Sequence, residues 1–144
     1  MYYSGKKKRH TIKSQVVVNK GNREIICTAF CAGSQHDFKL FVESKTRINP
    51  SITVLTDSGY QGIKKLHKNS LHPVKASKNK PLSQSDKDFN RILSSERALN
   101  ENVIGFIKRF KIISERYRNR RKRFGLRFNL IAGICNYESN NNWF

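Results

Sequence analysis

A carboxylate flanked by two cations is the feature of this chain with the clearest potential for chemistry. Arg97, Glu101 and Lys108 are separated by four and seven residues, so on a helix they fall within roughly 40° of one another and share one face. One interpretation is an amphipathic helix with an ordinary i,i+4 ion pair. The other is a catalytic carboxylate beside cations that hold phosphate, and it requires a second acid elsewhere in the chain.

Asp57 is the second acid. It follows the apolar stretch 51–56 and precedes a glycine-bearing loop, so it stands at the end of a predicted strand, where α/β folds place ligands and metals. An Asp that only opens a turn would give the same pattern, and the pattern alone leaves both interpretations open. Asp37 precedes a short helix predicted over 38–44, and we interpret it as a helix-terminal charge rather than a catalytic group.

The helix that carries Glu101 has a predicted apolar stripe on its other side. Leu99, Val103, Phe106 and Phe110 share that side, which favours packing against a sheet while the Arg-Glu-Lys face looks elsewhere. Residues 83–86 resemble a capping box, which predicts where this helix begins.

The rest of the pattern predicts one α/β domain over residues 1–138 and a disordered tail at 139–144. Two β-branched stretches around the turn 19–22 predict an antiparallel hairpin over 11–32, and residues 72–74 suggest one more short strand. A last helix is predicted over 114–137. Its first part should be exposed and basic, with Tyr117 and Phe124 among the arginines. Its later part should be packed through the apolar residues Leu126, Leu130, Ile131 and Ile134.

Composition indicates the partner. Lys and Arg number 29 and Asp and Glu number 10, a net charge of +19 over 144 residues, which is tolerable mainly beside a polyanion such as nucleic acid. Cations gather in residues 64–80 and 116–127, which suits contact with a phosphate backbone. The run 6–10 is equally consistent with such contact and with a solvated tail.

The sequence also points away from several classes of protein. Three cysteines form neither an even disulfide set nor a zinc-site spacing. No run of about 18 apolar residues predicts a membrane span, and no glycine pattern predicts a nucleotide cofactor. We therefore expect a cytoplasmic protein with reduced cysteines.

Four segments together resemble bacterial insertion-sequence transposases of the DDE endonuclease superfamily, including Harbinger-like relatives. They are residues 3–10, 33–38 and 57–62 and the spacing Arg97-x3-Glu101-x6-Lys108, and residues 117–125 are similar to the family's C-terminal segment. The resemblance implies a ribonuclease-H-like fold, a mixed sheet flanked by helices. It also implies a nucleoid-associated enzyme that acts on transposon ends and target DNA, as a homo-oligomer when complete.

The resemblance assigns roles residue by residue. It makes Asp57 and Glu101 the second and third metal-binding acids, and Arg97 and Lys108 the cations of a Tyr-Arg-Glu-Lys signature whose tyrosine is replaced here by Ser94. Because the chain starts at the segment that follows the first acid in the family, we expect a C-terminal part that lacks the first strand, the first catalytic Asp and the upstream DNA-binding part. It could be a gene remnant or a frameshift product.

The implied chemistry is metal-dependent cleavage and transfer of DNA strands. Carboxylates suit Mg²⁺ or Mn²⁺, and two such ions about 3.5 to 4 Å apart can activate the attacking oxygen and stabilise the leaving one. We therefore predict that the Asp57 and Glu101 carboxylates approach within about 4 to 7 Å, with Asp37 outside the pair, and that this chain alone transfers strands poorly. The alternative is a basic nucleic-acid-binding protein without catalysis.

Overall fold

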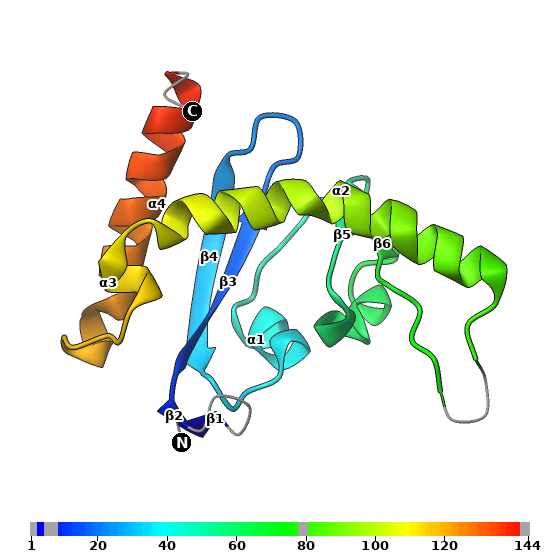
Figure 1. Ribbon diagram of the computed structural model, residues 1–144, viewed down its shortest axis with the longest axis horizontal. Helices are drawn as coiled ribbons and strands as arrows, with labels where there is room; N and C mark the ends of the chain where they lie inside the picture. The colour runs from blue at the N-terminus through cyan, green and yellow to red at the C-terminus, as the bar shows by residue number, and fades with distance from the viewer. Residues whose placement is uncertain (1–2, 5–8, 78–80, 142–144) are drawn as a thin grey trace.

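A β-hairpin packed under one long helix sets the architecture. The computed structural model describes residues 3–4, 9–77 and 81–141 (Figure 1). Strands β3 (Ile12–Val18) and β4 (Ile25–Ala32) pair antiparallel in the predicted hairpin, with an irregularity between Val17 and Val18. A smaller antiparallel pair precedes it, β1 (Tyr3–Ser4) with β2 (Arg9–His10). Of the basic run 6–10, residues 6–8 lie outside the described part of the chain.

Helix α2 (Gln84–Lys108) runs across the molecule, from a free end past the small strands to the hairpin (Figure 1). The predicted capping box begins it, because the Ser83 hydroxyl accepts from the Asp86 N–H and the Asp86 carboxylate accepts from the Ser83 N–H. The predicted stripe packs inward as expected. However, the most buried residue of the helix is Ile107, at 1% exposure, which the predicted stripe did not include. The helix ends at Lys108, so Phe110 of the stripe lies beyond it.

The segment that carries Asp57 is built from short elements. Helix α1 (Asp37–Glu43) is the predicted short helix, and it buries Leu40 and Phe41. Strand β5 (Val54–Leu55) precedes Asp57 as predicted and pairs parallel with β6 (Ser70–Leu71). The additional strand therefore lies just before residues 72–74 rather than on them. Two 3-10 turns, η1 (Ser58–Tyr60) and η2 (Ile63–Lys65), connect β5 to β6.

The prediction of one helix over 114–137 is wrong. Helix α3 (Lys111–Ser114) ends where that helix was expected to begin, and the turn η3 (Arg121–Arg123) leads into helix α4 (Phe124–Asn140). Residues 115–120 hold four charged residues, one asparagine and one tyrosine, so they lack the apolar spacing that would pack a helix against the core. The predicted tail at 139–144 begins inside α4, and residues 142–144 lie outside the described range.

The two faces of α4 differ from the expectation as well. Phe124, expected among the exposed arginines, is buried at 7% exposure and lies against Phe30 of β4 and Tyr117. Ile131 is packed as predicted, but Leu126 and Leu130 are 72% and 67% exposed. Helical spacing identifies an apolar face but does not say whether a neighbour covers it.

The core lies where α2, α4 and the hairpin meet. Its buried members are Ile25, Val103, Ile107, Phe124, Phe128, Ile131, Ala132 and Cys135. The fold is a mixed α/β one, as predicted, but the described strands form three separate two-stranded sheets rather than one mixed sheet. The cysteines are free. In the described part of the chain, none of the helices has the length and apolar character to span a membrane.

Candidate functional site

Asp57 stands at the end of β5 and caps the turn that follows. The Ser58 N–H donates to its carboxylate, and just before it the Thr56 N–H donates to the Leu71 carbonyl at 2.9 Å, which anchors the end of β5 to β6. Asp57 therefore both follows a strand and opens a turn, as the two interpretations of the sequence proposed. The side chain is 57% exposed, so it is accessible to a ligand.

Arg97 connects the long helix to this strand end. Its Nη2 lies 3.5 Å from Oδ2 of Asp57. Arg97 is only 23% exposed, so the ion pair is partly shielded from water on the arginine side. The contact brings the predicted catalytic face of α2 to the second predicted acid, although the two residues are forty positions apart in the chain.

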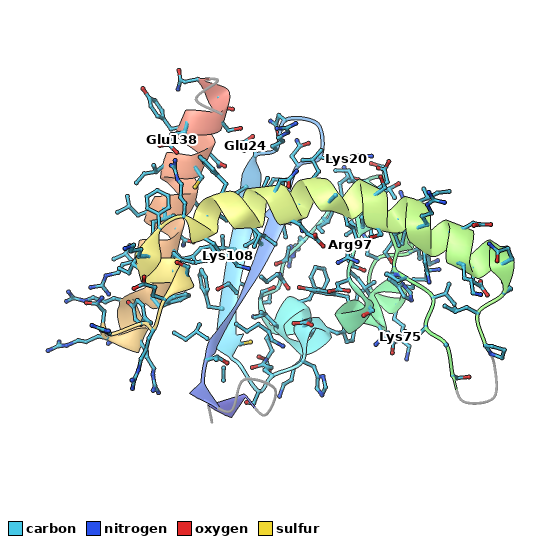
Figure 2. All side chains as sticks on the ribbon, viewed as in Figure 1. Lys20, Glu24, Lys75, Arg97, Lys108 and Glu138 are labelled. Atoms are coloured by element: carbon cyan, nitrogen blue, oxygen red, sulfur yellow. The ribbon has the colours of Figure 1, made fainter. Side chains whose placement is uncertain are left out.

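Glu101 and Lys108 continue along the same helix. Glu101 is exposed one turn after Arg97, about 6 Å further along the axis, and it makes no ion pair with any other described residue. Lys108 ends α2, about 16 Å from Arg97 along the axis, beside α3 (Figure 2). The structure thus brings Arg97 to Asp57, with Glu101 next in line, and leaves Lys108 at the far end of α2.

Asp37 also borders this site. It is the acidic residue in the first turn of α1, as interpreted from the sequence, and its Oδ1 pairs with Lys13 Nζ at 3.0 Å. Its other carboxylate oxygen lies against Gly59, so closely that a Cβ on Gly59 would overlap it. In the sequence, Gly59 was the available signal that another group packs closely against the loop after Asp57. Asp37 therefore packs on the loop that presents Asp57.

Tyr60 shows the effect of both aspartates. The pKa of Tyr60 is raised from 10 to about 12. Burial is the largest cause, followed by the charge of Asp37, the charge of Asp57 and a smaller effect of Cys31. The phenol therefore stays protonated near neutral pH, and its O–H donates to Oε1 of Gln15 at 3.4 Å. Gln15 is 4% exposed, and its amide nitrogen has no hydrogen-bond partner among the described residues. Sequence analysis singled out neither residue.

The donors present suit a divalent cation in type. Asp57 and Glu101 offer carboxylate oxygens, and Mg²⁺ commonly binds through one or two carboxylates together with water and substrate phosphate rather than in an all-protein cage. Within residues 3–4, 9–77 and 81–141, no three His, Cys, Asp or Glu side chains are placed so that they could hold a metal together. A cation here would therefore depend on oxygens from outside these residues.

An exposed strand-end aspartate that meets a helix with an Arg-x3-Glu face is an arrangement suited to phosphodiester chemistry. Residues 1–136 match the family described as DDE superfamily endonuclease. The chain belongs to this family, which confirms the resemblance seen in the sequence. DDE-type endonucleases use divalent metal ions.

A curated relative supports the same assignment. The chain is 46% identical over 137 residues to a probable transposase for insertion sequence element IS702 from Microchaete diplosiphon. The alignment covers 95% of this chain and 50% of the relative, so the chain spans about half the length of that protein. No solved structure matches the chain.

Proposed function

We propose that this chain forms part of a transposase that cleaves and transfers DNA strands at a metal-dependent site containing Asp57 and Glu101. The observation that carries the proposal is the contact between Arg97 and Asp57. It brings the end of β5 to the helix turn that presents Glu101, in a chain of the DDE family that is 46% identical to a probable transposase.

Asp57 and Glu101 would hold the cation, Mg²⁺ or Mn²⁺, through their carboxylate oxygens. When bound, such a cation activates an attacking water or hydroxyl and stabilises the leaving oxygen of a phosphodiester. The short hydrogen bond from the Ser58 N–H orients the Asp57 carboxylate. Asp37, by packing on Gly59, holds the loop that carries it.

Arg97 would act on both the acid and the substrate. In the structure its guanidinium offsets the negative charge of Asp57. With Asp57 committed to a cation, the planar fork of Arg97 would be available for a phosphate oxygen of DNA. Lys108, about 16 Å further along α2, would contact DNA phosphate outside the reacting centre.

The finer features of the family are part of this proposal. They are a ribonuclease-H-like arrangement completed by residues beyond the described strands, transposon ends and target DNA as substrates, action as a homo-oligomer, and a place beside the bacterial nucleoid in the cytoplasm. No nucleotide cofactor takes part. The +19 net charge favours DNA as the partner.

Iron-directed cleavage of the protein tests the shared metal site without requiring turnover. Fe²⁺ replaces Mg²⁺ and, with ascorbate and peroxide, generates hydroxyl radicals that cut the backbone nearby. We expect cuts close to both residue 57 and residue 101, suppressed by excess Mg²⁺. In Asp57→Asn and Glu101→Gln, Mn²⁺ affinity should fall at least about tenfold, the scale seen when even an outer-shell partner is lost.

Glu115→Gln is the matched control, because Glu115 is an exposed carboxylate outside the site. It should leave both the cutting pattern and the Mn²⁺ affinity unchanged. Cuts near only one of the two acids would refute a shared site.

The alternative is a basic DNA-binding protein without chemistry, and the exposed cations of residues 116–123 favour it. Nicking of supercoiled DNA separates the two functions. The endonuclease predicts nicking that requires Mg²⁺ or Mn²⁺ and is lost in Asp57→Asn. The alternative predicts binding that neither the metal nor this substitution changes.

A further inference from the structure

Helix α4 is apolar on two opposite sides, but only one of them is covered. Its inner side packs into the core through Phe124, Phe128, Ile131 and Cys135, all at most 7% exposed. Its outer side carries Leu126, Leu130 and Ile134, three of the four residues that the sequence led us to expect in the core, together with Tyr137. Leu126, Leu130 and Tyr137 are 72%, 67% and 69% exposed, and Ile134 is 39% exposed. A helix that is hydrophobic all round is normally buried all round.

The exposed residues form a continuous seam. Leu126, Leu130, Gly133 and Tyr137 follow one another at intervals of four, three and four residues, with Ile134 beside them, and we call these five residues the outer stripe. Such spacing is that of a helix–helix seam. At its middle, a Cβ on Gly133 would meet no atom within 4 Å, so a second helix could approach α4 closely there.

The charge of α4 indicates what covers the stripe. Its 17 residues contain one cation and one anion, Arg127 and Glu138, and both are engaged, with Tyr117 and Arg109 respectively. The helix is therefore neutral in a chain of net charge +19. A polyanion would find no cation on the outer stripe, whereas a second, equally cationic chain would meet the least repulsion there.

We propose that the outer stripe joins two copies of this chain, with their α4 helices antiparallel about a twofold axis near residues 131 and 132. The inference rests on the homo-oligomer of the proposed function and assigns the surface that forms it. In this register Leu126 faces Tyr137 of the second copy, and Leu130 faces Gly133 and Ile134. The stripe is thus complementary to itself, as a twofold interface requires.

The ends of the helix favour the antiparallel direction. The basic turn 121–123 immediately precedes α4. In an antiparallel pair it lies beside the C-terminal end of the other α4, where unpaired carbonyls carry partial negative charge. A parallel pair would place the two basic turns side by side.

Sedimentation equilibrium of the full chain, at a salt concentration that screens its net charge, tests the contact. We expect a monomer–dimer equilibrium, and Leu130→Glu should weaken it at least about tenfold by placing a charge in the seam. Because Leu130 is 67% exposed, the thermal unfolding of the monomer should not change. Ile92→Glu is the control, since Ile92 is 65% exposed on α2, and it should leave dimerisation intact.

Disulfide trapping tests the direction, with Cys27 and Cys31 replaced by serine. Leu126→Cys combined with Tyr137→Cys should link two chains on mild oxidation. Leu126→Cys alone should not, because the two residues 126 would lie about 16 Å apart along the axis, beyond the reach of a disulfide. A chain that stays monomeric, a dimer indifferent to Leu130→Glu, or linkage by Leu126→Cys alone would overturn the proposal.

Discussion

Gly59 is the residue that links the two aspartates of the site. Asp57 lies two residues before it in the chain, and the Asp37 carboxylate rests on its Cα from α1. Because Gly59 has no side chain, the Asp37 carboxylate can lie directly against it. Gly59 is not needed for a left-handed backbone, since the positive φ among the described glycines belongs to Gly62.

Gly59→Ala should destabilise the protein, because its methyl group would overlap Asp37 and force either the loop or α1 to move. We expect a loss of about 1 to 3 kcal/mol in the free energy of unfolding, the usual cost of overpacking. Urea titration followed by circular dichroism measures it.

Gly105→Ala provides the control. A Cβ at Gly105 meets no atom within 4 Å, and the residue lies inside α2, so alanine should stabilise by up to about 1 kcal/mol through helix propensity. If both alanine variants changed stability equally, the contact between Asp37 and Gly59 would not constrain the loop.

Helix α4 is attached to strand β4 by amide hydrogen bonds as well as by apolar packing. The Asn136 side chain accepts from the Ile25 N–H at 2.8 Å and donates to the Ile25 carbonyl at 3.0 Å, which is how a neighbouring strand would pair. Two turns earlier on the helix, the Asn129 side chain accepts a hydrogen bond from the Thr28 hydroxyl. The side chains of α4 thus satisfy part of an otherwise open strand edge.

Asn136→Leu should remove both bonds to Ile25 and leave a buried N–H and C=O without partners. Each such group costs about 1 to 3 kcal/mol, so unfolding should become easier by about 2 kcal/mol or more, measured by urea titration. Asn140→Leu, at the exposed end of α4, should change stability by less than about 0.5 kcal/mol. A similar small effect of Asn136→Leu would mean that water takes over its bonds.

Elements with a strong local signal were predictable from the sequence. The hairpin followed from two β-branched stretches around a turn, and the start of α2 from its capping box. Helix α4 was predicted only in part, because periodicity cannot say whether Leu126 and Leu130 have a neighbour. The pairing of β5 with β6 was not predictable, since it joins two short segments on either side of the turns η1 and η2.

For the site, local pattern could place the candidate residues on their elements, but it could not show how those elements meet. Asp57 at a strand end and the shared face of Arg97 and Glu101 follow from local pattern, and the structure brings Arg97 to Asp57. The roles of Asp57, Glu101, Arg97 and Lys108 stay predictions. The contact of Asp37 with Gly59 and the bond from Tyr60 to Gln15 join segments far apart in the chain, which spacing cannot reveal.

At the scale of the whole molecule, positive charge is concentrated in the connection between α3 and α4. Arg116, Arg118 and Arg120 are exposed there, in a segment whose extended path was not anticipated. Such a segment can follow a phosphate backbone without the constraint of a helical surface.

Replacing these three arginines with glutamine should weaken binding to duplex DNA and flatten its dependence on salt. Each lost phosphate contact lowers the slope of log affinity against log salt by about 0.9, so the slope should fall by up to about 2.7 in fluorescence anisotropy titrations. Asp57→Ala should leave both affinity and slope unchanged.

A variant with the same loss of charge elsewhere tests whether the segment matters. Lys45→Gln, Arg47→Gln and Arg91→Gln remove three exposed cations outside it, and the slope should change less. If the two triple variants had equal effects, binding would depend on total charge rather than on this segment.

The bond between Ile25 and Asn136 joins residues 111 positions apart, and this has a consequence for how the chain folds. Closing so long a loop costs roughly 4 kcal/mol of entropy, so the local hairpin should form early and α4 should dock late. During synthesis at about 5 to 20 residues per second, the hairpin face that α4 covers would stay open for on the order of ten seconds. In that interval the nascent chain would need a chaperone, or the ribosome surface, to keep that face from aggregating.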